Sequence, residues 1–519
     1  MAFGKRKAGT WPVEAEEVDV ALIGGGVLSA TAGLLLHALQ PDWKIVGYER
    51  LPKVAKESSN PWNNAGTGHS GLCELNYTKE LPDGSMDNTK PVQVNEQFQQ
   101  TRQLWAHLVE QGVLGLPDTF VNPCPHMSIV HGDDDVEFLR KRWETLKDNP
   151  LFSSMEFSDD QDKIREWAPM LVDGRDPSEH IAVTYDPTGT DVDFGSITTQ
   201  VFNHLAFDGV NVETSKEVTD LKKNSDGSWT LRIVDRGEIG ARKGGEKFVR
   251  AKFVFNGAGG WALKMLQKAG IPEVAGYALF PVTGAFMSTD DPSVVDEHKV
   301  KVYAKPPVGA PPMSNPHMDA RVINGSRSVL FGPYAGIDPR FLKYGSVLDL
   351  PKMIRFDNIG AVLNVAKDNI PLVNMLVGMI FMTPAQKLAE MREFAPAATM
   401  TDWHLIKAGQ RAQIIKTGKD GKGGTLEFGT EVVTSADGTL CAVLGASPGA
   451  STAVPIVLEC LTKCFPDKIA EWEPRFKEMI PSYGEKLSDN PDRAFEIMSH
   501  TAEVLKLHAP IKLGEAPKA

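Results

Sequence analysis

The sequence predicts an α/β fold, and two observations lead to that prediction. Residues 18–49 combine a strand-like run, a glycine turn, a helical run and a second strand. Two more glycine turns follow strand-like runs, at 257–260 and 445–449. A glycine turn between a parallel strand and a helix is typical of doubly wound sheets that bind dinucleotides. We therefore expect a Rossmann-like domain assembled from discontinuous segments, joined to a second domain of mixed sheet and helices.

The first glycine turn has the spacing of a phosphate-binding site. Gly24 allows a tight turn, Gly26 lets a pyrophosphate approach the backbone, and a helix beginning near Val27 offers free N–H groups. Ser29 replaces the third glycine of the usual pattern and is small enough for the helix to pack on the strand. An acid at the end of the second strand suits the ribose hydroxyls. The residues expected to contact a dinucleotide here are Gly24, Gly25, Gly26, Ser29, Glu49 and Arg50.

Length, charge and composition limit the class of protein. A chain of 519 residues is longer than a single domain with one hydrophobic core usually is, so two or more domains are expected. The net charge of −12 excludes a general nucleic-acid binder. The five cysteines form no C-x-x-C pair, which favours reduced core thiols in a cytosolic protein. The 12 histidines do not cluster at ligand spacing, so we expect no metal site.

The apolar runs are too short to cross a bilayer. The N-terminus has basic residues but no following apolar core, so we expect no secretory signal. No run reaches the roughly 20 apolar residues that a spanning helix needs. The longest apolar run, 370–382, is expected to be a buried helix. The alternative is a hydrophobic plateau that dips into a membrane.

The order of the segments indicates where the domains divide. We assign 17–80, 181–270 and 406–470 to the dinucleotide domain, and 81–180 and 271–405 to a substrate domain. Helical spacing dominates the first substrate segment. The second combines a mixed sheet up to about residue 350 with helices up to 405. Residues 471–519 are expected to form a C-terminal helical segment and tail.

Five longer motifs carry a resemblance to a known family. They are DVALIGGG at 19–26, SSNPWNNAGTGHSGLCELNY at 58–77, PHMDAR at 316–321, GQRAQIIK at 409–416 and GASPGAST at 445–452. Over nearly its whole length the chain resembles the FAD-dependent malate:quinone oxidoreductases. The first motif is widespread among dinucleotide-binding proteins, whereas the NNAGTGH and GASPGAST runs are specific.

The resemblance implies a function and a location. It implies FAD as cofactor, oxidation of L-malate to oxaloacetate, hydride transfer to flavin N5 and a membrane quinone as electron acceptor. Such an enzyme links the tricarboxylic acid cycle to the respiratory chain and attaches peripherally to the cytoplasmic face of the bacterial inner membrane. One alternative is another flavin-linked 2-hydroxy acid dehydrogenase or oxidase, for example for 2-hydroxyglutarate. Two others are an NAD-linked enzyme and a flavin-binding scaffold without turnover.

The resemblance also indicates which residues contact the flavin. The loop after residue 58 is expected to face the ring, and Val218 the adenine. The turn at 445–452 leads into a helix whose positive N-terminus would favour negative charge on the reduced flavin. Beyond the first glycine turn, the expected FAD contacts are Asn63, Asn64, Gly66, Thr67, Gly68, His69, Ser70, Val218, Gly257, Gly259, Gly445, Ser447, Pro448, Gly449, Ser451 and Thr452.

Two histidines are candidates for the catalytic base. A histidine titrates near neutral pH and can accept the hydroxyl proton of a 2-hydroxy acid. We favour His317, and His69 is the rival. Arg321 is expected to hold a substrate carboxylate in a bidentate fork, although a surface ion pair is about equally expected. Arg411 and Lys416 are candidates for the second carboxylate, and Lys416 is somewhat more readily explained as a solvated strand residue.

Overall fold

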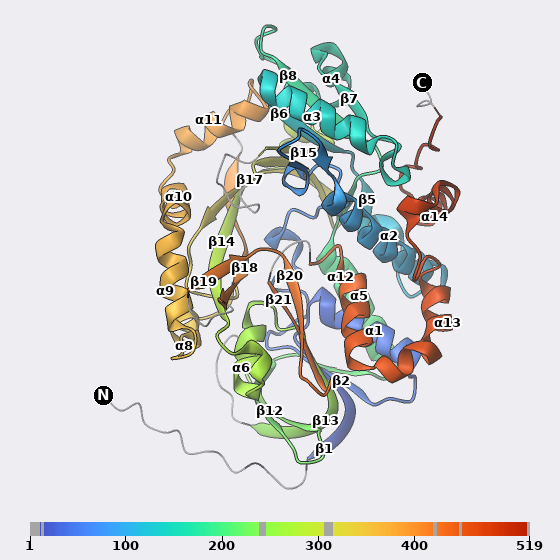
Figure 1. Cartoon of the computed structure of the whole chain (residues 1–519), viewed down its shortest axis with the longest axis vertical. Helices are drawn as coiled ribbons and strands as arrows, with labels where there is room; N and C mark the ends of the chain where they lie inside the picture. The colour runs from blue at the N-terminus through green and yellow to red at the C-terminus, as the bar shows by residue number, and fades with distance from the viewer. Residues whose placement is uncertain are drawn as a thin grey trace.

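Two β-sheets organise the molecule. The computed structural model describes residues 11, 15–237, 245–305, 315–401, 403–418, 423–445 and 449–515. The first sheet lies at the lower end of the long axis in Figure 1, and the second extends through the upper half. The α/β fold is therefore confirmed, with helices packed around both sheets.

The first sheet is built from segments far apart in the chain. Its strand order is β10-β2-β1-β13-β12-β11, and β21 also pairs with β13 while β20 pairs with β21. The run from β10 through β2, β1 and β13 to β21 is parallel, as a doubly wound fold requires. The strands are β1 (Glu16–Ile23), β2 (Ile45–Tyr48), β10 (Asn211–Glu213), β11 (Lys216–Lys223), β12 (Trp229–Asp235), β13 (Glu246–Asn256), β20 (Thr430–Thr434) and β21 (Leu440–Gly445).

Strand β1 is buried on both faces, because helices cover one side and β11, β12 and a helix cover the other. Successive side chains of a strand point to opposite faces. Val20 and Leu22 pack against α1 (Val27–Leu39), α5 (Phe194–Phe207) and α12 (Ala453–Cys464). Ala21 and Ile23 pack into the opposite core, which includes α6 (Ala262–Ala269). This double burial explains why β1 ends in the continuous apolar run from Val20 to Ile23, whereas its exposed start carries Glu16 and Glu17.

The second sheet is mixed. Its order is β19-β18-β14-β17-β16-β15-β6-β8-β7, and only the β15–β6 pair is parallel. The strands are β6 (His126–His131), β7 (Glu156–Ser158), β8 (Ile181–Asp186), β14 (Ala278–Thr289), β15 (Lys301–Ala304), β16 (His317–Ile323), β17 (Ser326–Gly336), β18 (His404–Thr417) and β19 (Gly424–Glu427). Two short pairs complete the strands: β3 (Lys79–Glu80) with β4 (Met86–Asp87), and β5 (Val121–Pro123) with β9 (Thr190–Val192).

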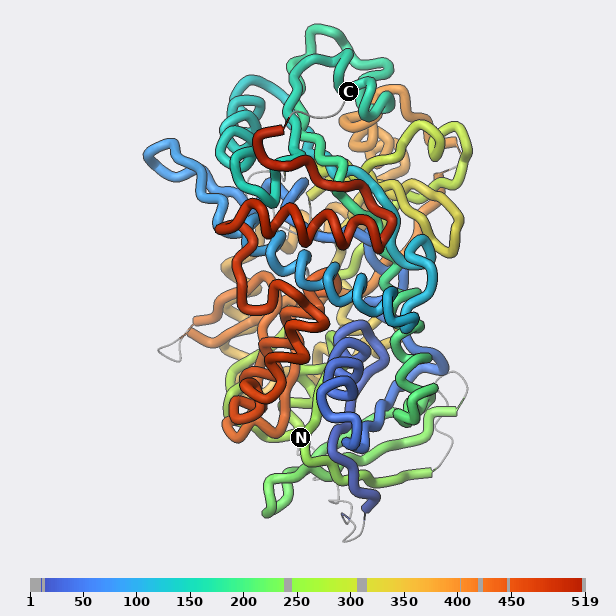
Figure 2. Tube along the Cα trace, turned by 90° about the vertical axis from the view of Figure 1, so that its right-hand side faces the viewer, coloured from blue at the N-terminus to red at the C-terminus, as the bar shows by residue number. Residues whose placement is uncertain are grey.

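Helices surround the second sheet and the region where the two sheets meet. Four consecutive helices form a column along the left edge of Figure 1: α8 (Asp349–Met353), α9 (Ile359–Asp368), α10 (Ile370–Ile380) and α11 (Pro384–Phe394). The remaining helices are α2 (Thr89–Glu110), α3 (Asp133–Leu146), α4 (Gln161–Trp167), α7 (Pro292–Val295), α13 (Ile469–Met479) and α14 (Pro491–Val504). Figure 2 shows α14, near the C-terminus, lying alongside α2, so segments far apart in the sequence pack together.

The pairing of the strands corrects three assignments at the domain boundaries. β8 falls within 181–270, and β18 and β19 fall within 406–470, both assigned from the sequence to the dinucleotide domain. All three strands pair in the second sheet instead. Strand-like sequence gives no indication of its partner, because pairing depends on contacts between distant segments.

Among the described residues, no single helix is long and apolar enough to cross a membrane. The pair α10 and α11 meets the criteria of length and composition together, but the two helices are bent by 106°.

Candidate active site

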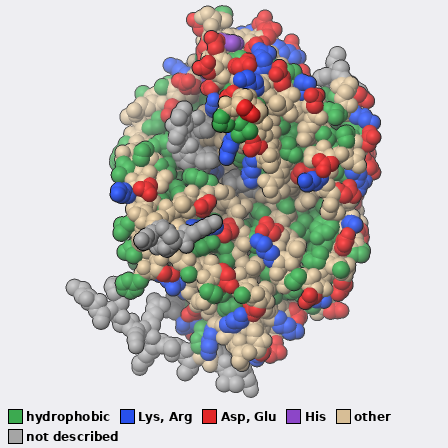
Figure 3. Space-filling view, viewed as in Figure 1, with side chains coloured by type: hydrophobic (Ala, Val, Ile, Leu, Met, Phe, Trp, Pro, Cys, Tyr) green, Lys and Arg blue, Asp and Glu red, His purple; other side chains and the backbone are tan. Residues whose placement is uncertain are grey.

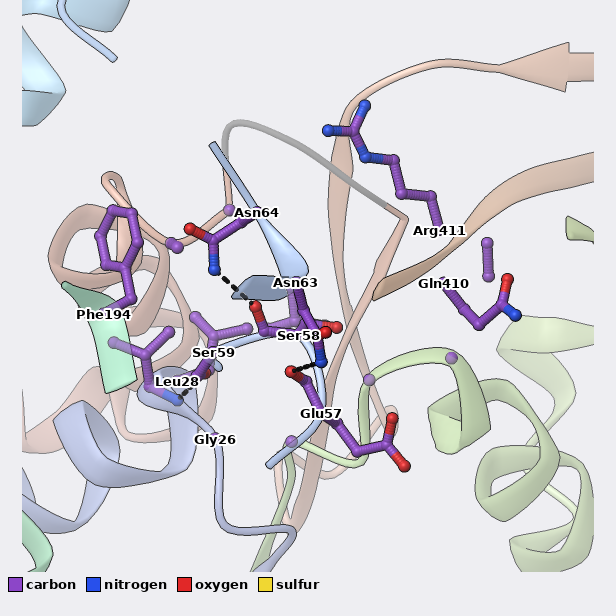
Figure 4. A pocket seen from close by; sticks show the side chains of 18 of the residues that line it. Gly26, Leu28, Glu57, Ser58, Ser59, Asn63, Asn64, Phe194, Gln410 and Arg411 are labelled. Atoms are coloured by element: carbon purple, nitrogen blue, oxygen red, sulfur yellow. Dashed lines mark hydrogen bonds between the residues drawn. The ribbon is translucent and has the colours of Figure 1, made fainter. Parts of the chain in front are cut away.

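A long cavity connects the glycine turns of the first sheet with polar residues of the second. Figure 4 shows its middle part, where Gly26 and Glu57 face the loop of Asn63 and Asn64, with Arg411 on the far side. Most of the residues that the sequence singles out meet here. The predicted residues that line the cavity are Gly24, Gly25, Gly26, Glu49, Arg50, Asn63, Asn64, Gly66, Thr67, His69, Val218, Gly257, Gly259, His317, Arg411, Gly445, Gly449 and Ser451.

The first glycine turn contacts the turn that follows β13. Gly24 has φ +98°, and a β carbon there would lie 2.7 Å from the carbonyl oxygen of Gly257. Both the positive φ and the lack of space require glycine. Helix α1 then begins with no acidic residue in its first turn and no side-chain cap. Of its exposed N–H groups, that of Val27 donates to Ser59 Oγ at 3.0 Å. The positive helix end therefore faces the cavity with little to neutralise it.

Glu49 lies at the end of β2, where the sequence predicts a ribose-binding acid. Its carboxylate accepts hydrogen bonds of 2.6 Å from the N–H groups of Gly25 and Leu51. Burial raises the pKa of Glu49, and these two N–H groups and the charge of Arg50 oppose the rise. The carboxylate is thus fixed in place on the cavity wall, with further lone pairs for hydroxyl donors.

Ser29 does not line the cavity. It is fully buried in α1, and its hydroxyl donates to the carbonyl oxygen of Ile23 at 3.4 Å. A β carbon on Gly257 would lie 2.2 Å from Ser29 Oγ, so the two residues pack directly against each other. Ser29 therefore holds helix and sheet together at close range, which is the packing role of the third glycine in the usual pattern.

The side chains of Asn63 and Asn64 shape the loop that crosses the cavity. Asn63 Nδ2 donates to the carbonyl of Glu57 at 2.7 Å, and Asn64 Nδ2 donates to that of Ser58 at 3.0 Å (Figure 4). Asn64 Oδ1 accepts from the N–H of Gly66 at 2.9 Å. Their polar groups are therefore engaged in the loop itself, and contacts with a ligand fall to the backbone and to neighbouring residues.

Gly68 and Ser70 also support the loop rather than line the cavity. A β carbon on Gly68 would lie 2.1 Å from Thr190 Oγ1, and the Gly68 N–H donates to the Thr190 carbonyl at 3.2 Å. Ser70 Oγ donates to the carbonyl of Gly68 at 3.2 Å. Glycine is needed at 68 because the loop lies directly on Thr190.

Each candidate base forms a pair with a buried carboxylate. Nδ1 of His317 pairs with Asp319, and Nδ1 of His69 pairs with Glu74. If Nδ1 carries the proton in the neutral ring, Nε2 is left as the acceptor. Burial favours the neutral acids, but the histidine partners outweigh it, so the pKa values of Asp319 and Glu74 are lowered. The ring of His317 also stacks on Tyr303, with centroids 4.4 Å apart.

A buried chain of charges extends from His317 to the cavity loop. Lys301 Nζ lies 3.8 Å from Asp319 Oδ1 and 2.9 Å from Asp191 Oδ1. Asp191 Oδ1 also pairs with Arg321 Nε at 2.8 Å. The four charged side chains are at most 1% exposed. Two acids and two bases balance one another, which is the condition for burying so many charges.

The position of Arg321 differs from the expected substrate clamp. Its guanidinium is fully buried, and Nη1 donates to the carbonyls of Pro61 and Asn64 at 3.0 and 2.6 Å. A β carbon on Gly66 would lie 2.4 Å from Arg321 Cζ, so the arginine lies directly beneath the loop. Arg321 therefore fixes the loop from below and does not reach the cavity.

The two basic candidates of β18 differ in position: one lines the cavity and the other does not. Lys416 does not line the cavity; its Nζ pairs with Glu431 at 2.9 Å. Arg411 lines the cavity, and no described residue forms an ion pair or a hydrogen bond with its guanidinium. Burial lowers the pKa of Arg411, and Tyr303 and Tyr77 partly offset this. An arginine always stays charged in proteins, so Arg411 is a cation directed at the cavity without a counter-ion among the described residues.

The last glycine turn brings another helix to the cavity. Gly445 has φ +91°, and a β carbon there would lie 2.0 Å from the carbonyl of Gly429. Gly449 and Ser451 line the cavity just before α12 begins; Thr452 occupies the N-cap position of that helix without a side-chain capping hydrogen bond and is not a lining residue. Ser451 Oγ is buried without a hydrogen-bond partner among the described residues. The predicted contacts Ser447 and Pro448 lie outside the described residues.

Several functional candidates were missed from the sequence. Asp319 could have been found, because residues two apart on a strand share a face and Asp319 follows His317 at that spacing. Glu74 lies within a quoted motif but five residues from its partner, on an irregular segment. Lys301 and Asp191 come from strands with no motif. Pairing of β15 with β16 brings Lys301 to the site, whereas Asp191 lies on β9 outside the second sheet and accepts from the N–H of Val322 in β16 at 2.8 Å. No group of three or more potential metal ligands occurs in the described part of the chain.

The fold matches solved flavoproteins at low sequence identity. The L-α-glycerophosphate oxidase of Mycoplasma pneumoniae, solved with FAD bound, has a TM-score of 0.55 at 14% identity, covering 86% of this chain and 95% of that one. The glycine oxidase of Geobacillus kaustophilus has a TM-score of 0.55 at 16% identity, covering 87% and 95%. These similarities concern the fold alone.

Sequence comparison gives closer relatives. A probable malate:quinone oxidoreductase of Kocuria rhizophila is 51% identical over 496 residues, which cover 96% of this chain and 99% of that protein. Another, from a Geobacillus species, is 50% identical over 490 residues, covering 94% and 95%. The profile of the malate:quinone oxidoreductase family matches residues 16–507. The chain therefore belongs to the malate:quinone oxidoreductase family.

Proposed function

We propose that the protein is an FAD-dependent enzyme that oxidises L-malate to oxaloacetate and passes the electrons to a membrane quinone. One observation carries the proposal: the cavity with the glycine turns at one end has two histidine–carboxylate pairs and the unpaired Arg411 at the other. A cofactor site and a site for an acidic alcohol are thus parts of the same cavity. The proposed role connects the tricarboxylic acid cycle with the respiratory chain.

The residues of the cavity suit FAD. Gly24 to Gly26 and the start of α1 present N–H groups to a pyrophosphate, and Glu49 is placed to accept from ribose hydroxyls. Val218 offers its backbone to the adenine. At the other end, the buried and unpartnered Ser451 Oγ and the positive end of α12 suit the polar edge of the flavin. When bound, FAD supplies the acceptor for the hydride that leaves C2 of malate.

The remaining steps belong to side chains of this chain. Arg411 holds a malate carboxylate in a bidentate fork, and burial strengthens that attraction. His317 accepts the hydroxyl proton at Nε2, because Nδ1 is directed to Asp319. Asp319 then stabilises the imidazolium that forms. His69 has the same arrangement with Glu74 and is the alternative base.

A quinone acceptor implies a location at a membrane. The named relatives use a quinone, and respiratory quinones dissolve in the lipid bilayer. We place the protein on the cytoplasmic face of the bacterial inner membrane as a peripheral enzyme, where a lipid-dissolved quinone and a soluble 2-hydroxy acid can both reach it.

A donor and acceptor screen tests this function. The purified protein is expected to be yellow and to reduce a soluble short-chain quinone with L-malate in the absence of NAD. D-malate, 2-hydroxyglutarate and lactate serve as competing donors. Faster turnover with 2-hydroxyglutarate would favour the alternative 2-hydroxy acid dehydrogenase. A colourless protein that needs NAD would overturn the proposal.

A further inference from the structure

The exposed apolar side chains of this protein are concentrated in one segment. Of the 17 strongly exposed large apolar residues in the described part of the chain, 11 lie between residues 344 and 381. The apolar face, as we name it, consists of Ile354, Phe356, Ile359, Leu363, Val377 and Phe381 on and between α8, α9 and α10. Apolar atoms recur along this edge at the left of Figure 3. Single exposed apolar residues are normal in soluble proteins, but a contiguous group marks an interaction surface.

Helix α10 has two apolar sides, and only one of them is used inside the protein. Leu376 is fully buried against Val282 and Ala335 of the second sheet. On the other side, Val377 and Phe381 are exposed, the latter by 77%. No charged residue occurs from 369 to 386. A helix that is apolar all round is normally covered on every side, so the outer side of α10 lacks a partner.

Cations gather at the lower end of the apolar face. Lys264 Nζ donates to the carbonyl oxygen of Lys352 at 2.5 Å. Burial lowers the pKa of Lys264, and the nearby charges of Lys268, Arg355 and Lys352 lower it further. Lys367 of α9 adds a fifth cation, but Asp368 follows it directly, and Arg355 pairs with Asp357 at 3.1 Å. The excess of positive charge therefore comes from Lys264, Lys268 and Lys352. This local excess of positive charge stands out in a chain with a net charge of −12.

The segment that leads into the apolar face contacts the active-site cavity. Leu342 lines the cavity, and the next residue, Lys343, donates through Nζ to Asn63 Oδ1 at 2.6 Å. The carbonyl of Tyr344 accepts from Arg50, another lining residue, at 2.9 Å. The segment at 342–344, which precedes α8 and the apolar face in the chain, is therefore part of the cavity wall.

We propose that the apolar face docks on a lipid bilayer that contains anionic lipids. Phe356, Phe381 and their neighbours enter the boundary between headgroups and acyl chains, and the cations of α6, α8 and α9 contact lipid phosphates. The charge pattern favours this partner, because apolar and cationic surface side by side matches an anionic bilayer. The proposal rests on the proposed function in one respect: a lipid-soluble quinone then reaches the cavity beside Leu342 from the membrane.

Vesicle flotation of the flavin-loaded enzyme tests the proposal. The probe is a vesicle of phosphatidylcholine with or without phosphatidylglycerol. The variant Phe356→Ser/Phe381→Ser weakens the apolar face, and Leu116→Ser/Phe207→Ser is the matched control, since Leu116 and Phe207 are 72% and 88% exposed elsewhere. We expect the native enzyme and the control to float with the mixed vesicles, and the first variant to bind at least tenfold more weakly. Lys352→Gln/Lys367→Gln is expected to remove the preference for phosphatidylglycerol.

Soluble activity separates this proposal from the proposed function. All variants are expected to reduce a soluble quinone with malate at the native rate, because none of the substituted residues lines the cavity. If the native enzyme lacks that activity, the proposed function fails whatever the vesicles show. If the apolar-face variant floats like the native enzyme, the docking proposal fails. It also fails if the native enzyme is a dimer that does not bind vesicles and the apolar-face variant is a monomer. A second copy of the chain would then cover this surface.

Discussion

The two ends of the cavity differ in composition: one is lined mainly by backbone and the other by ionisable side chains. At the Gly24 end, the wall is mainly backbone: glycine turns, a helix N-terminus and one fixed carboxylate. At the His317 end, the wall rests on ionisable side chains, most of them buried and paired. A backbone site binds a group of constant charge by shape and N–H groups. A site of paired ionisable side chains can accept a proton and release it again. The comparison predicts that steric changes matter most at the first end and charge changes at the second.

The largest effect is expected from adding a side chain to the backbone end. Gly24→Val places its β carbon 2.7 Å from the Gly257 carbonyl, which neither turn can relieve. Gly84→Val is the matched control: Gly84 also has a positive φ, +81°, but nothing lies within 4 Å of its β carbon. The shared cost of the left-handed conformation is about 1–2 kcal/mol. We expect the purified Gly24 variant to retain less than about a tenth of the flavin absorbance of the control. Equal flavin content in the two variants would contradict the claim that lack of space requires glycine at this end of the cavity.

The next largest effect is expected from a substitution at the charged end that does not change cofactor binding. His317→Gln is expected to lower turnover with malate by a factor of about 10² to 10⁴, because general-base catalysis contributes that much. The flavin content should not change, since His317 lies on the second sheet, away from the glycine turns. His69→Gln is made in parallel, and stopped-flow reduction of the flavin by malate measures both. A larger loss in the His69 variant would reverse the assignment of the base.

A smaller effect separates two cations of the same strand. Arg411→Met removes an unpaired cation from the cavity and is expected to raise KM for malate by about 10- to 100-fold, the value of one to two charged hydrogen bonds. Lys416→Met is the control on β18, because Lys416 pairs with Glu431 away from the cavity. Steady-state kinetics over a range of malate concentrations gives both values. Similar KM values for the two variants would mean that Arg411 does not bind a carboxylate.

The two ends also differ in how far the sequence predicts them. The glycine turns and Glu49 follow from local pattern, because each function needs only a few consecutive residues and a strand on either side. Helix α2 follows from periodicity, and the mixed sheet from its β-branched and aromatic composition. The three strands β8, β18 and β19, placed by sequence in segments of the dinucleotide domain, pair in the second sheet, since nothing in a short apolar run specifies its partner.

Prediction was weaker at the charged end for a physical reason. Arg321 has the residue type of a carboxylate clamp, and its sequence spacing from His317 gives no hint of Asp191, which neutralises it from another strand. Lys301 and Asp191 were missed because their roles exist only through contacts between three separate segments. The resemblance to a family identified the loops that surround the site, and the side-chain partners required the structure.

The smallest effect distinguishes the two histidine–carboxylate pairs by their pH dependence. Asp319→Asn keeps a polar partner for His317 but removes the negative charge that favours the imidazolium. The charged form is then less stable, so the acid limb of the kcat/KM profile should move to lower pH, by about one unit for a buried pair. Glu74→Gln makes the matching change beside His69.

Only the pair that transfers the proton should shift the profile, because the limb reports the free enzyme's essential base. Both carboxylates have lowered pKa values and remain charged through the neutral range, so a shift cannot come from their own titration. We expect the shift with Asp319→Asn, together with a lower plateau because a less basic imidazole accepts the proton less readily. A shift with Glu74→Gln and none with Asp319→Asn would place the proton on His69. The charged network around Lys301 would then serve to hold the loop over Arg321 and Lys301, whose side chains donate to the carbonyls of Asn64 and Ala65.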